Sequence, residues 1–318
     1  MLNHSEVTPC GDTVQVDRTE PHPLHGNRIV LDSHDPRFPE ALRAIPHPPK
    51  SLYLVGNADA LQEGISIVGA RKATPYGRGC ARRFAEIAAS LGVAVISGGA
   101  LGCDTEAHRG ALQAGGITVA FLGGGCDQLY PSRNRKLFQQ IVDSGGAIVS
   151  ERDWAEPPLP WMFRERNRLI AGLSKATLVV EAGLPSGTFS TADEALSAGK
   201  DVLSIPGSIV SPTSAGSNRL ISQGAMPIVD DETFESALHM LFSTLRHDGA
   251  ANIPAIPDDP LIAALMANPM RADAILAAGL HASPYTLMQT LSNYERDGIL
   301  ERYPDGRYGP SQVWMMHR

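Results

Sequence analysis

Between residues 65 and 229, short apolar runs alternate with longer segments whose apolar residues recur every three or four positions. The short runs predict β-strands, and the longer segments predict amphipathic helices. The predicted strands cover residues 65–69, 93–97, 118–122, 147–150, 177–181, 202–205 and 226–229. Strands that alternate with helices in this way are typical of a parallel sheet. We therefore expect an α/β fold for this part of the chain.

The predicted helices carry their own start signals. Thr74 can cap the first helix, and Pro75 suits its first position. Ser132 is placed to cap another helix that runs to about residue 142. Further helices are expected at residues 104–114, 169–173, 190–198, 216–223 and 232–245. The last has an apolar stripe that would pack in the core by default, although part of it could face a second subunit.

The segments on either side of this block differ in pattern. Residues 1–28 are polar, rich in His and Pro and without periodicity, so we expect disorder there. Two short strands near residues 29–31 and 52–55 open the main domain, which we expect to span 29–245. Gly and Pro cluster in a linker at 246–257. Residues 258–318 then suggest three helices and a hairpin around Pro304-Asp305-Gly306, which is the order of a winged helix.

Turns rich in glycine or hydroxyl groups follow the predicted strands. They are Gly69-Ala70-Arg71, Ser97-Gly98-Gly99, Gly123-Gly124-Gly125, Ser186-Gly187-Thr188 and Pro206-Gly207-Ser208. The carboxyl ends of parallel strands share one edge of a sheet, where exposed backbone N–H groups can meet phosphates. The basic run 164–168 lies among these turns. The pattern indicates a nucleotide or nucleic-acid ligand.

Composition and charge refine this picture. The net charge of −7 argues mildly against a nucleic-acid ligand, but residues 71–83 carry only basic charges and the local field governs contact. No apolar run approaches the ~20 residues that span a bilayer, and no secretory signal is evident. The four cysteines lack metal spacing. We expect a cytoplasmic protein without a membrane segment, a metal or another cofactor.

Seven motifs occur in an order and spacing that together identify a family. They are Asp35-Pro36-Arg37-Phe38-Pro39, Val68-Gly69-Ala70-Arg71, Ser97-Gly98-Gly99-Ala100, Gly123 with Tyr130-Pro131 and Asn134, Phe163 with Arg166-Asn167-Arg168, Glu181-Ala182 with Ser186-Gly187-Thr188, and Pro206-Gly207 with Asn218. The chain resembles the DNA-processing protein DprA (Smf) family over residues 32–234, and less firmly over 260–308. It departs from the family at Leu101, Cys103 and Arg164.

The resemblance implies a fold and a function. The fold would be an extended Rossmann-like domain followed by a small C-terminal winged helix. The function would be non-catalytic: such proteins bind single-stranded DNA, form homodimers and help to load the recombinase RecA on incoming strands in natural transformation. No cofactor is implied.

Among the basic residues, Arg71 is a candidate for a phosphate contact, because it stands between a strand and a helix start and its guanidinium can fork onto a phosphate. The alternative is a surface arginine paired with a carboxylate. Arg166, Asn167 and Arg168 point about 100° apart on a helix, so they cannot all face one ligand. We expect Arg166 to reach the DNA, and Arg168 or Asn167 to brace neighbouring loops. The alternative is an internal salt bridge to Glu151 or Glu181.

The remaining candidates are backbone groups, hydroxyls and aromatic rings. The glycine turns would offer N–H groups through Ser97, Gly98, Gly99, Gly123, Gly124 and Gly125, although such turns are often only structural. Hydroxyl and amide donors come from Ser186, Gly187, Thr188 and Asn218, for which helix capping is an equal explanation. Phe163 and Tyr130 could each stack on a base, a contact worth about 1–3 kcal/mol, or pack in the core.

An enzyme is the competing class. Asp104 and His108 are four residues apart on one helix face and could act as acid and base, but a cap and a structural histidine are the preferred interpretation. Asp127 and Glu181 could orient Arg166 or Arg168. The run 182–188 partly resembles the P-G-G-x-G-T motif of nucleotide phosphoribohydrolases, with Glu194 as the acid. No G-x-G-x-x-G follows the first strand of the block, which argues against NAD.

Overall fold

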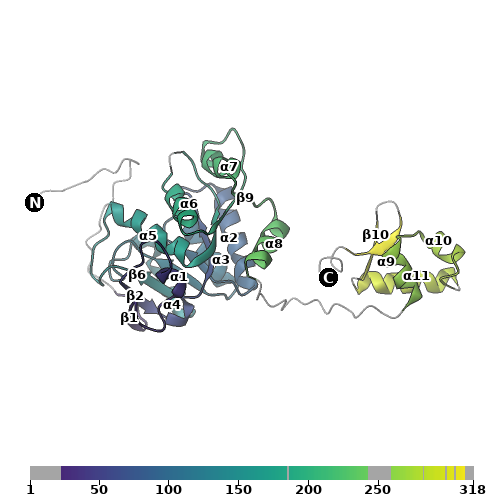
Figure 1. Ribbon diagram of the computed structural model, residues 1–318, viewed down its shortest axis with the longest axis horizontal. Helices are drawn as coiled ribbons and strands as arrows, with labels where there is room; N and C mark the ends of the chain where they lie inside the picture. The colour runs from purple at the N-terminus through teal and green to yellow at the C-terminus, as the bar shows by residue number, and fades with distance from the viewer. Residues whose placement is uncertain are drawn as a thin grey trace, which may run out of the picture. The chain divides into compact units, whose positions relative to one another are not determined.

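A computed structural model describes residues 23–184, 186–242, 259–281, 283–297, 299–303 and 306–311. The chain divides into two compact units, Met1–Leu245 and Arg246–Arg318 (Figure 1). The segments 1–22 and 246–257, expected to be disordered and a linker, lie outside the described residues. Order begins before residue 29, however, because Leu24 is only 3% exposed and belongs to a buried cluster with Leu137 and Ile148.

A nine-stranded sheet forms the centre of the first unit, in the order β1-β2-β6-β5-β4-β3-β7-β8-β9. The strands are β1 (Arg28–Asp32), β2 (Ser51–Gly56), β3 (Gly64–Val68), β4 (Val95–Ser97), β5 (Thr118–Phe121), β6 (Ala147–Ser150), β7 (Ser174–Val179), β8 (Asp201–Ser204) and β9 (Met226–Pro227). All neighbours from β6 to β9 are parallel, which confirms the expectation for the alternating block. The two preceding strands extend the sheet in antiparallel fashion.

Helices cover both faces of this sheet. They are α1 (Glu40–Arg43), α2 (Pro75–Ser90), α3 (Cys103–Gln113), α4 (Arg135–Asp143), α5 (Pro160–Gly172), α6 (Thr188–Ser197), α7 (Ala215–Ser222) and α8 (Asp231–Leu241), with 3-10 turns at Ala58–Ala60, Ser132–Asn134 and Pro212–Ser214. The 3-10 turn at Ser132 precedes α4, so Ser132 does not cap an α-helix directly as expected.

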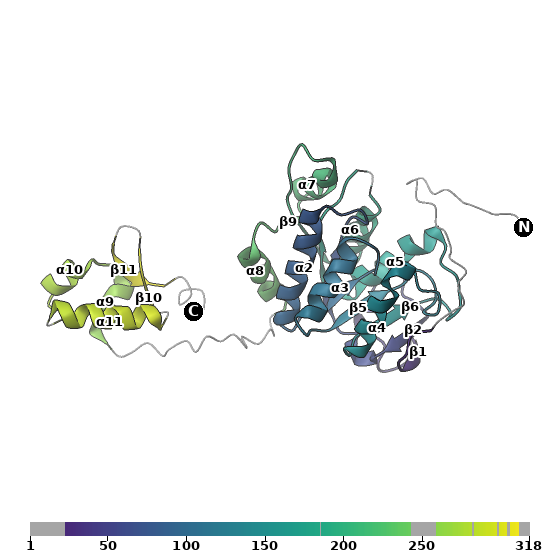
Figure 2. The same cartoon turned by 180° about the vertical axis from the view of Figure 1, so that it is seen from behind.

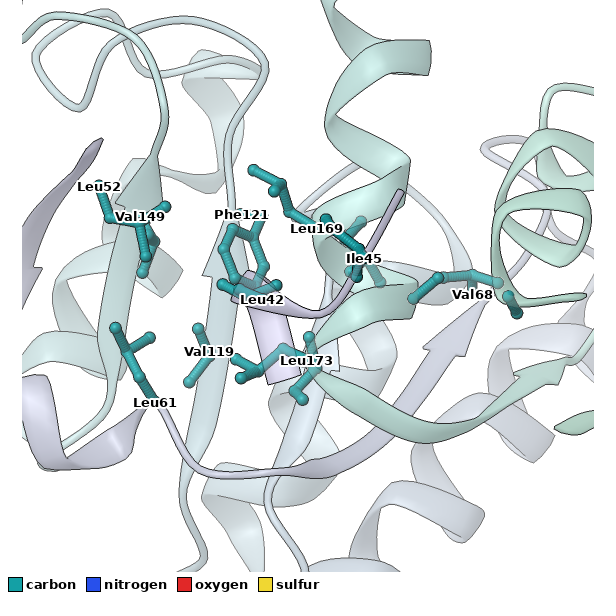
Figure 3. Close-up of a cluster of buried hydrophobic side chains, with 14 of the residues drawn as sticks. Leu42, Ile45, Leu52, Leu61, Val68, Val119, Phe121, Val149, Leu169 and Leu173 are labelled. Atoms are coloured by element: carbon teal, nitrogen blue, oxygen red, sulfur yellow. The ribbon is translucent and has the colours of Figure 1, made fainter. Parts of the chain in front are cut away.

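Successive residues of a strand pack into hydrophobic clusters on opposite faces of the sheet. Val119 and Phe121 of β5 join a cluster with α1, α5 and α6 on one face (Figure 3). Ala120 between them joins the cluster of α4 on the other face. Helices α2, α3 and α8 bury Phe84 and Phe234 on that second face, where α2 and α3 lie side by side (Figure 2). Burial on both faces explains why the parallel strands read as continuous apolar runs.

The predicted start of α2 is confirmed. Thr74 is its N-cap, and the Thr74 Oγ1 accepts a hydrogen bond from the Gly77 N–H at 3.1 Å. Helix α8 buries Phe234 and Leu238, and Phe242 directly after it is only 7% exposed, so this part of the apolar stripe packs in the core as expected by default.

The second unit has its own core. Helices α9 (Pro260–Ala267), α10 (Ala272–Ala277) and α11 (Pro284–Arg296) precede an antiparallel pair, β10 (Leu300–Arg302) and β11 (Tyr308–Pro310). Leu265, Leu287 and Leu291 are fully buried in it. The elements occur in the predicted order, and the winged-helix classification stays a prediction. Pro304 and Asp305 of the expected turn lie outside the described residues. Among the helices described in both units, none is long and apolar enough to cross a membrane.

Candidate nucleic-acid interface

The predicted turns meet at one edge of the sheet. β5, β4, β3, β7 and β8 are consecutive parallel neighbours, so their carboxyl ends face the same way. The chain order reverses at β3, which pairs with β4 on one side and β7 on the other. Such a switch point is where open α/β sheets bind ligands, outside the carboxyl ends of the strands. The turn that carries Arg71 directly follows β3. We refer to this side of the sheet as the carboxyl edge.

An arginine and two aromatic rings form a cluster at the carboxyl edge. The guanidinium carbon of Arg71 lies 5.5 Å from the centroid of the Phe163 ring, within the range of a cation–π contact. The Phe163 and Tyr130 centroids are 5.3 Å apart. Arg71 is exposed and both rings are half-buried. We call Arg71, Phe163 and Tyr130 the edge cluster. It presents a cation and apolar ring surface together, which suits a phosphate and a base.

Arg166 lies beneath the carboxyl edge instead of on its surface. It is only 6% exposed, and its Nη1 donates to the carbonyl oxygens of Gly98, at 2.8 Å, and Phe121. Burial lowers its pKa to about 10, an effect that the nearby Asp104 carboxylate opposes. Arg166 therefore lies below the surface on which we expected it to meet the DNA. Two carbonyls and the Asp104 carboxylate offset part of the cost of the buried charge, whereas Arg166 Nε is buried and makes no hydrogen bond within the described part of the chain.

Buried side chains near Arg166 also hydrogen-bond the backbone of the Ser97–Gly99 turn. Asp104 Oδ2 accepts from the Gly98 N–H at 3.2 Å and from the Ala100 N–H at 3.3 Å. Asn134 Nδ2 donates to the Gly99 carbonyl at 2.9 Å. The prediction that Gly98 offers a bare N–H to a phosphate is therefore wrong. Gly98 is required for another reason, because a Cβ there would lie 2.7 Å from Arg166 Nη2.

Ser97 is equally internal, since it is fully buried and its hydroxyl donates to the Ile67 carbonyl at 2.7 Å. Gly99 has a φ of +66°, which favours glycine, and a Cβ there would lie 2.6 Å from the Phe138 ring. The whole turn is therefore shaped by the protein's own interior. The sequence offered no signal for this, because short glycine turns look alike whether a ligand or a side chain approaches them.

The Gly123–Gly125 turn is covered by neighbouring parts of the chain. A Cβ on Gly123 would lie 2.8 Å from the Phe163 ring, and one on Gly124 would lie 2.8 Å from the Pro158 nitrogen. The Gly125 N–H donates to the Glu156 carbonyl at 2.8 Å. All three glycines are buried. They permit close approach of an aromatic ring and a protein backbone, where a phosphate was expected.

Asn167 and Arg168 brace the structure, the role that we expected of one of them. Asn167 Nδ2 donates to Ser190 Oγ at 2.6 Å and so links α5 to α6. Arg168 forks onto Glu151 at 2.9 and 2.6 Å, and its Nε donates to the His47 carbonyl at 2.9 Å. The pair with Glu151 is the internal salt bridge that was the alternative for this basic run.

Asp127 and Glu181, which could have oriented Arg166 or Arg168, have other hydrogen-bond partners. Asp127 accepts both guanidinium nitrogens of Arg28, at 2.8 and 2.9 Å. Glu181 is buried and accepts the Thr74 N–H at 2.8 Å. Each carboxylate follows its strand but is taken by a partner from a distant part of the sequence, which spacing alone does not reveal.

The turns after β7 and β8 remain partly open. Gly187 is exposed, and nothing lies within 4 Å of a Cβ built on it. Ser186 Oγ accepts the Thr188 N–H at 3.2 Å, a local cap at the start of α6. Asn218 holds Gly207 from both sides, donating to its carbonyl at 3.0 Å and accepting its N–H at 3.1 Å. Asn218 therefore holds the turn after β8 from within α7 (Ala215–Ser222) and does not cap a helix, while Ser186 and Gly187 stay accessible.

Asp104 and His108 lie deep below the carboxyl edge, at 6% and 0% exposed. The Thr118 hydroxyl donates to the Val95 carbonyl at 2.7 Å, so His108 Nδ1, 2.8 Å away, must donate to Thr118. Burial lowers the pKa of His108 to about 3 and raises the pKa of Asp104. The histidine is neutral and structural. Among the described residues, no group of three or more His, Cys, Asp or Glu side chains is placed to hold a metal ion.

Sequence comparison relates the chain to DNA-processing proteins. It is 40% identical to protein Smf of Escherichia coli over 207 residues, which is 65% of this chain and 55% of that protein. It is 38% identical to DNA processing protein DprA of Streptococcus pneumoniae over 194 residues, 60% of this chain and 67% of that protein. With the Smf proteins of E. coli and Synechocystis, the match spans about half of the relative's length.

Solved structures agree. DprA from S. pneumoniae superposes with a TM-score of 0.62 at 33% identity, covering 66% of this chain and 74% of its own. DNA processing protein A from Helicobacter pylori, described for its single-stranded DNA binding mode, gives a TM-score of 0.62 at 29% identity over 70% of this chain and all of its own. The family model for DNA recombination-mediator protein A matches residues 29–239. The chain therefore belongs to the DNA recombination-mediator protein A family.

Proposed function

We propose that this chain binds single-stranded DNA along the carboxyl edge, with Arg71 on a phosphate and Phe163 against a base. The observation that carries the proposal is the edge cluster, in which an exposed guanidinium lies over a half-buried aromatic ring at the switch point of the sheet. Ser186 and Gly187 add accessible polar groups on the same edge. The H. pylori relative, described for binding single-stranded DNA, supports this choice of ligand.

The buried residues have a supporting role in this proposal. Arg166, Asp104 and Asn134 hold the turns after β4 and β5 from below. They keep the edge rigid, so that the exposed groups are in place before the strand arrives. The exposed groups would contact the phosphate backbone of the DNA and the faces of its bases. Binding is therefore largely independent of the DNA sequence and weakens as the salt concentration rises.

At the level of the pathway, we propose that the chain acts as a homodimer that delivers single strands to the recombinase RecA during DNA uptake. The family description, a recombination mediator, supports this role. A direct test is the rate at which RecA assembles on a single strand, with and without this protein. An unchanged rate would contradict the mediator role and leave the binding proposal intact.

We also propose that the chain acts by binding and not by catalysis. The pair of side chains that could serve as acid and base, Asp104 and His108, is buried beneath the edge and already hydrogen-bonded. If the chain were instead a phosphoribohydrolase, incubation with AMP would release free adenine, which chromatography detects. No release is expected.

The binding proposal is tested by fluorescence anisotropy with a labelled oligo-dT strand. Arg71→Ala should weaken binding roughly tenfold or more, since a hydrogen bond to a charged group contributes about 1.5–3 kcal/mol. Phe163→Ala should weaken it by a similar factor through lost stacking. Lys200→Ala is the matched control, because Lys200 precedes β8 and therefore lies at the opposite edge of the sheet. Equal affinities for wild type and both edge variants would refute the site.

A further inference from the structure

One aromatic residue at the carboxyl edge is not explained by the edge cluster. Tyr76 stands in the first turn of α2, and its side chain is 55% exposed. Its hydroxyl donates to the Pro206 carbonyl at 3.1 Å. This bond ties the far end of the ring to the turn after β8. A tyrosine fixed at its tip and still half accessible is a rigid apolar surface, which loses little side-chain entropy when a planar group stacks on it.

The loop that holds the Tyr76 hydroxyl is itself unusually apolar at its tip. Ile209 and Val210 follow Pro206 closely and are 94% and 86% exposed. These two adjacent branched side chains are almost fully exposed, so they could pack against a partner that binds at this loop. The accessible surface around the turn after β8 is therefore apolar where a plain solvent loop would be polar.

The charges around Tyr76 define what kind of partner fits. Residues 71–79 include Arg71, Lys72 and Arg78, all exposed, and no acidic residue. The nearby Glu181 carboxylate is buried, so the exposed charge of this segment is basic and favours an anionic partner that is also planar and apolar. A nucleic-acid strand combines both properties, because each nucleotide carries a phosphate and a base with a stacking face.

Sheet order places Tyr76 and Phe163 on opposite sides of Arg71. Phe163 packs over Gly123, which follows β5, whereas Tyr76 bonds to the residue that follows β8 by two positions. Between β5 and β8 there are four inter-strand spacings in the order β5-β4-β3-β7-β8. At ~4.8 Å each, they span about 19 Å. A flexible strand that crosses this distance passes Arg71 on its way.

We propose that Tyr76 is a second stacking site for a base of the same DNA strand, on the β8 side of Arg71, with Ile209 and Val210 flanking the base. The inference rests on the proposed function and adds a direction to it: the strand runs across the carboxyl edge from the end of β5 to the end of β8. Bases at two separated positions are held by Phe163 and Tyr76, and the phosphates between them by Arg71.

The test uses anisotropy with oligo-dT strands of increasing length. Wild type should gain affinity in a step once a strand is long enough to reach from Phe163 to Tyr76. Tyr76→Ala should bind the shortest strands normally, lose this step and bind long strands about tenfold more weakly. Tyr76→Trp should restore the step, since it keeps a stacking ring. Tyr285→Ala, at a tyrosine that is 73% exposed in the second unit, is the matched control.

Covalent mapping gives an independent readout. A strand that carries 5-iodouracil at a single position is irradiated with the full chain, and the attached residue is identified by mass spectrometry. Different positions on one strand should attach to Phe163 and to Tyr76. Attachment to Phe163 alone from every position would overturn the inference.

The outcomes separate this inference from the proposed function. If Arg71→Ala weakens binding while Tyr76→Ala matches wild type at every length, the second stacking site is refuted and the proposed function stands. If wild type binds no strand, both fail. If Tyr76→Ala changes the sedimentation mass of the protein and not its DNA affinity, the apolar surface contacts a second copy of the chain, and the inference is overturned.

Discussion

Arg71 and Arg166 show how two residues of one type divide the work of a site at the scale of single side chains. Arg71 is exposed beside Phe163, whereas Arg166 is buried and donates to the Gly98 and Phe121 carbonyls. The sequence assigned both to the ligand, because each stands in a motif close to a predicted turn. Burial separates them, and burial depends on packing of α5 against β5 and β7 that local sequence does not encode.

Replacement of Arg166 tests its internal role. Arg166→Met should lower the free energy of unfolding by about 3–5 kcal/mol, because it leaves the buried Asp104 carboxylate and two carbonyls without their cation. Urea denaturation measures the loss. The double variant Arg166→Met with Asp104→Leu should lose less than the sum of the two single changes. Normal stability of Arg166→Met combined with lost DNA binding would show instead that Arg166 contacts the strand.

His108 predicts a dependence of stability on pH. Its pKa falls from 6.5 to about 3 on folding, because burial disfavours the charged ring and Arg166 repels it. The folded state therefore binds this proton more weakly than the unfolded state. Its stabilising contribution is complete above pH 6.5 and declines as the pH falls towards 3.

Urea denaturation at a series of pH values checks this dependence. The unfolding midpoint of wild type should drop between pH 6.5 and 4, and His108→Leu should flatten that part of the curve. Buried Asp104 acts in the opposite direction, since its raised pKa favours folding at low pH. A wild-type slope that persists unchanged in His108→Leu would assign the effect to other groups.

At the scale of elements, the start of α2 joins two parts of the sheet. Glu181, which follows β7, accepts the Thr74 N–H and packs against Gly77. Tyr76 in the same turn bonds to Pro206 beyond β8. The helix start is thereby fixed relative to the ends of β7 and β8. The residue at which α2 begins was predictable from Thr74 and Pro75, but the attachment of this helix start to β7 and β8 was not.

Two glycines of α2 offer a matched comparison of this attachment. A Cβ on Gly77 would lie 3.0 Å from the Cδ of Glu181, whereas nothing lies within 4 Å of one on Gly79. Gly79→Ala should stabilise the protein by about 0.5–1 kcal/mol, because alanine favours a helix. Gly77→Ala should destabilise it by roughly 1–3 kcal/mol, because Glu181 is buried and has no room to move. Equal shifts in urea midpoint would contradict this packing.

The bounds of the elements were largely predictable, and the interior of the site was not. The strand β6 matches the predicted residues 147–150, because this apolar run is bounded clearly on both sides. Most of the run 169–173 lies in α5 as expected, but that helix begins at Pro160, where its first turn carries aromatic and charged residues without a clear period. We call the buried side chains of Asp104, Asn134 and Arg166 the clamp. These residues come from three segments that are distant in the sequence, so no local sequence pattern predicts that they meet.

At the scale of the whole molecule, the acidic net charge and the basic edge coexist. The chain carries −7 overall, yet residues 71–79 contribute only cations to the carboxyl edge. Several other arginines are neutralised by neighbours, including Arg83 by Asp231 and Arg168 by Glu151. The basic charge is local because the strand order brings the turns that follow the parallel strands together at the carboxyl edge. A sum over the sequence hides such a local field.

The dependence of binding on salt tests this local field. Affinity for oligo-dT should fall linearly with salt on logarithmic axes, by about 0.7 per phosphate neutralised on a single strand. Arg71→Ala should reduce the slope by about that amount, and Lys200→Ala at the opposite edge should leave it unchanged. Titrations by anisotropy at several salt concentrations give the slopes. Affinity that does not change with salt would exclude phosphate contacts as the main source of binding.

The clamp beneath the turns has a consequence for anyone who wishes to redirect this protein to another polymer. Gly98 and Gly124 have no space for a side chain, because Arg166 and Pro158 stand within 3 Å of where it would begin. Substitutions at these two glycines would disrupt the fold of the turns before they change which ligand the protein prefers. Arg71, Tyr76 and Gly187 are exposed, so a library confined to positions 71, 76 and 187 would vary the ligand preference without disturbing the buried residues beneath.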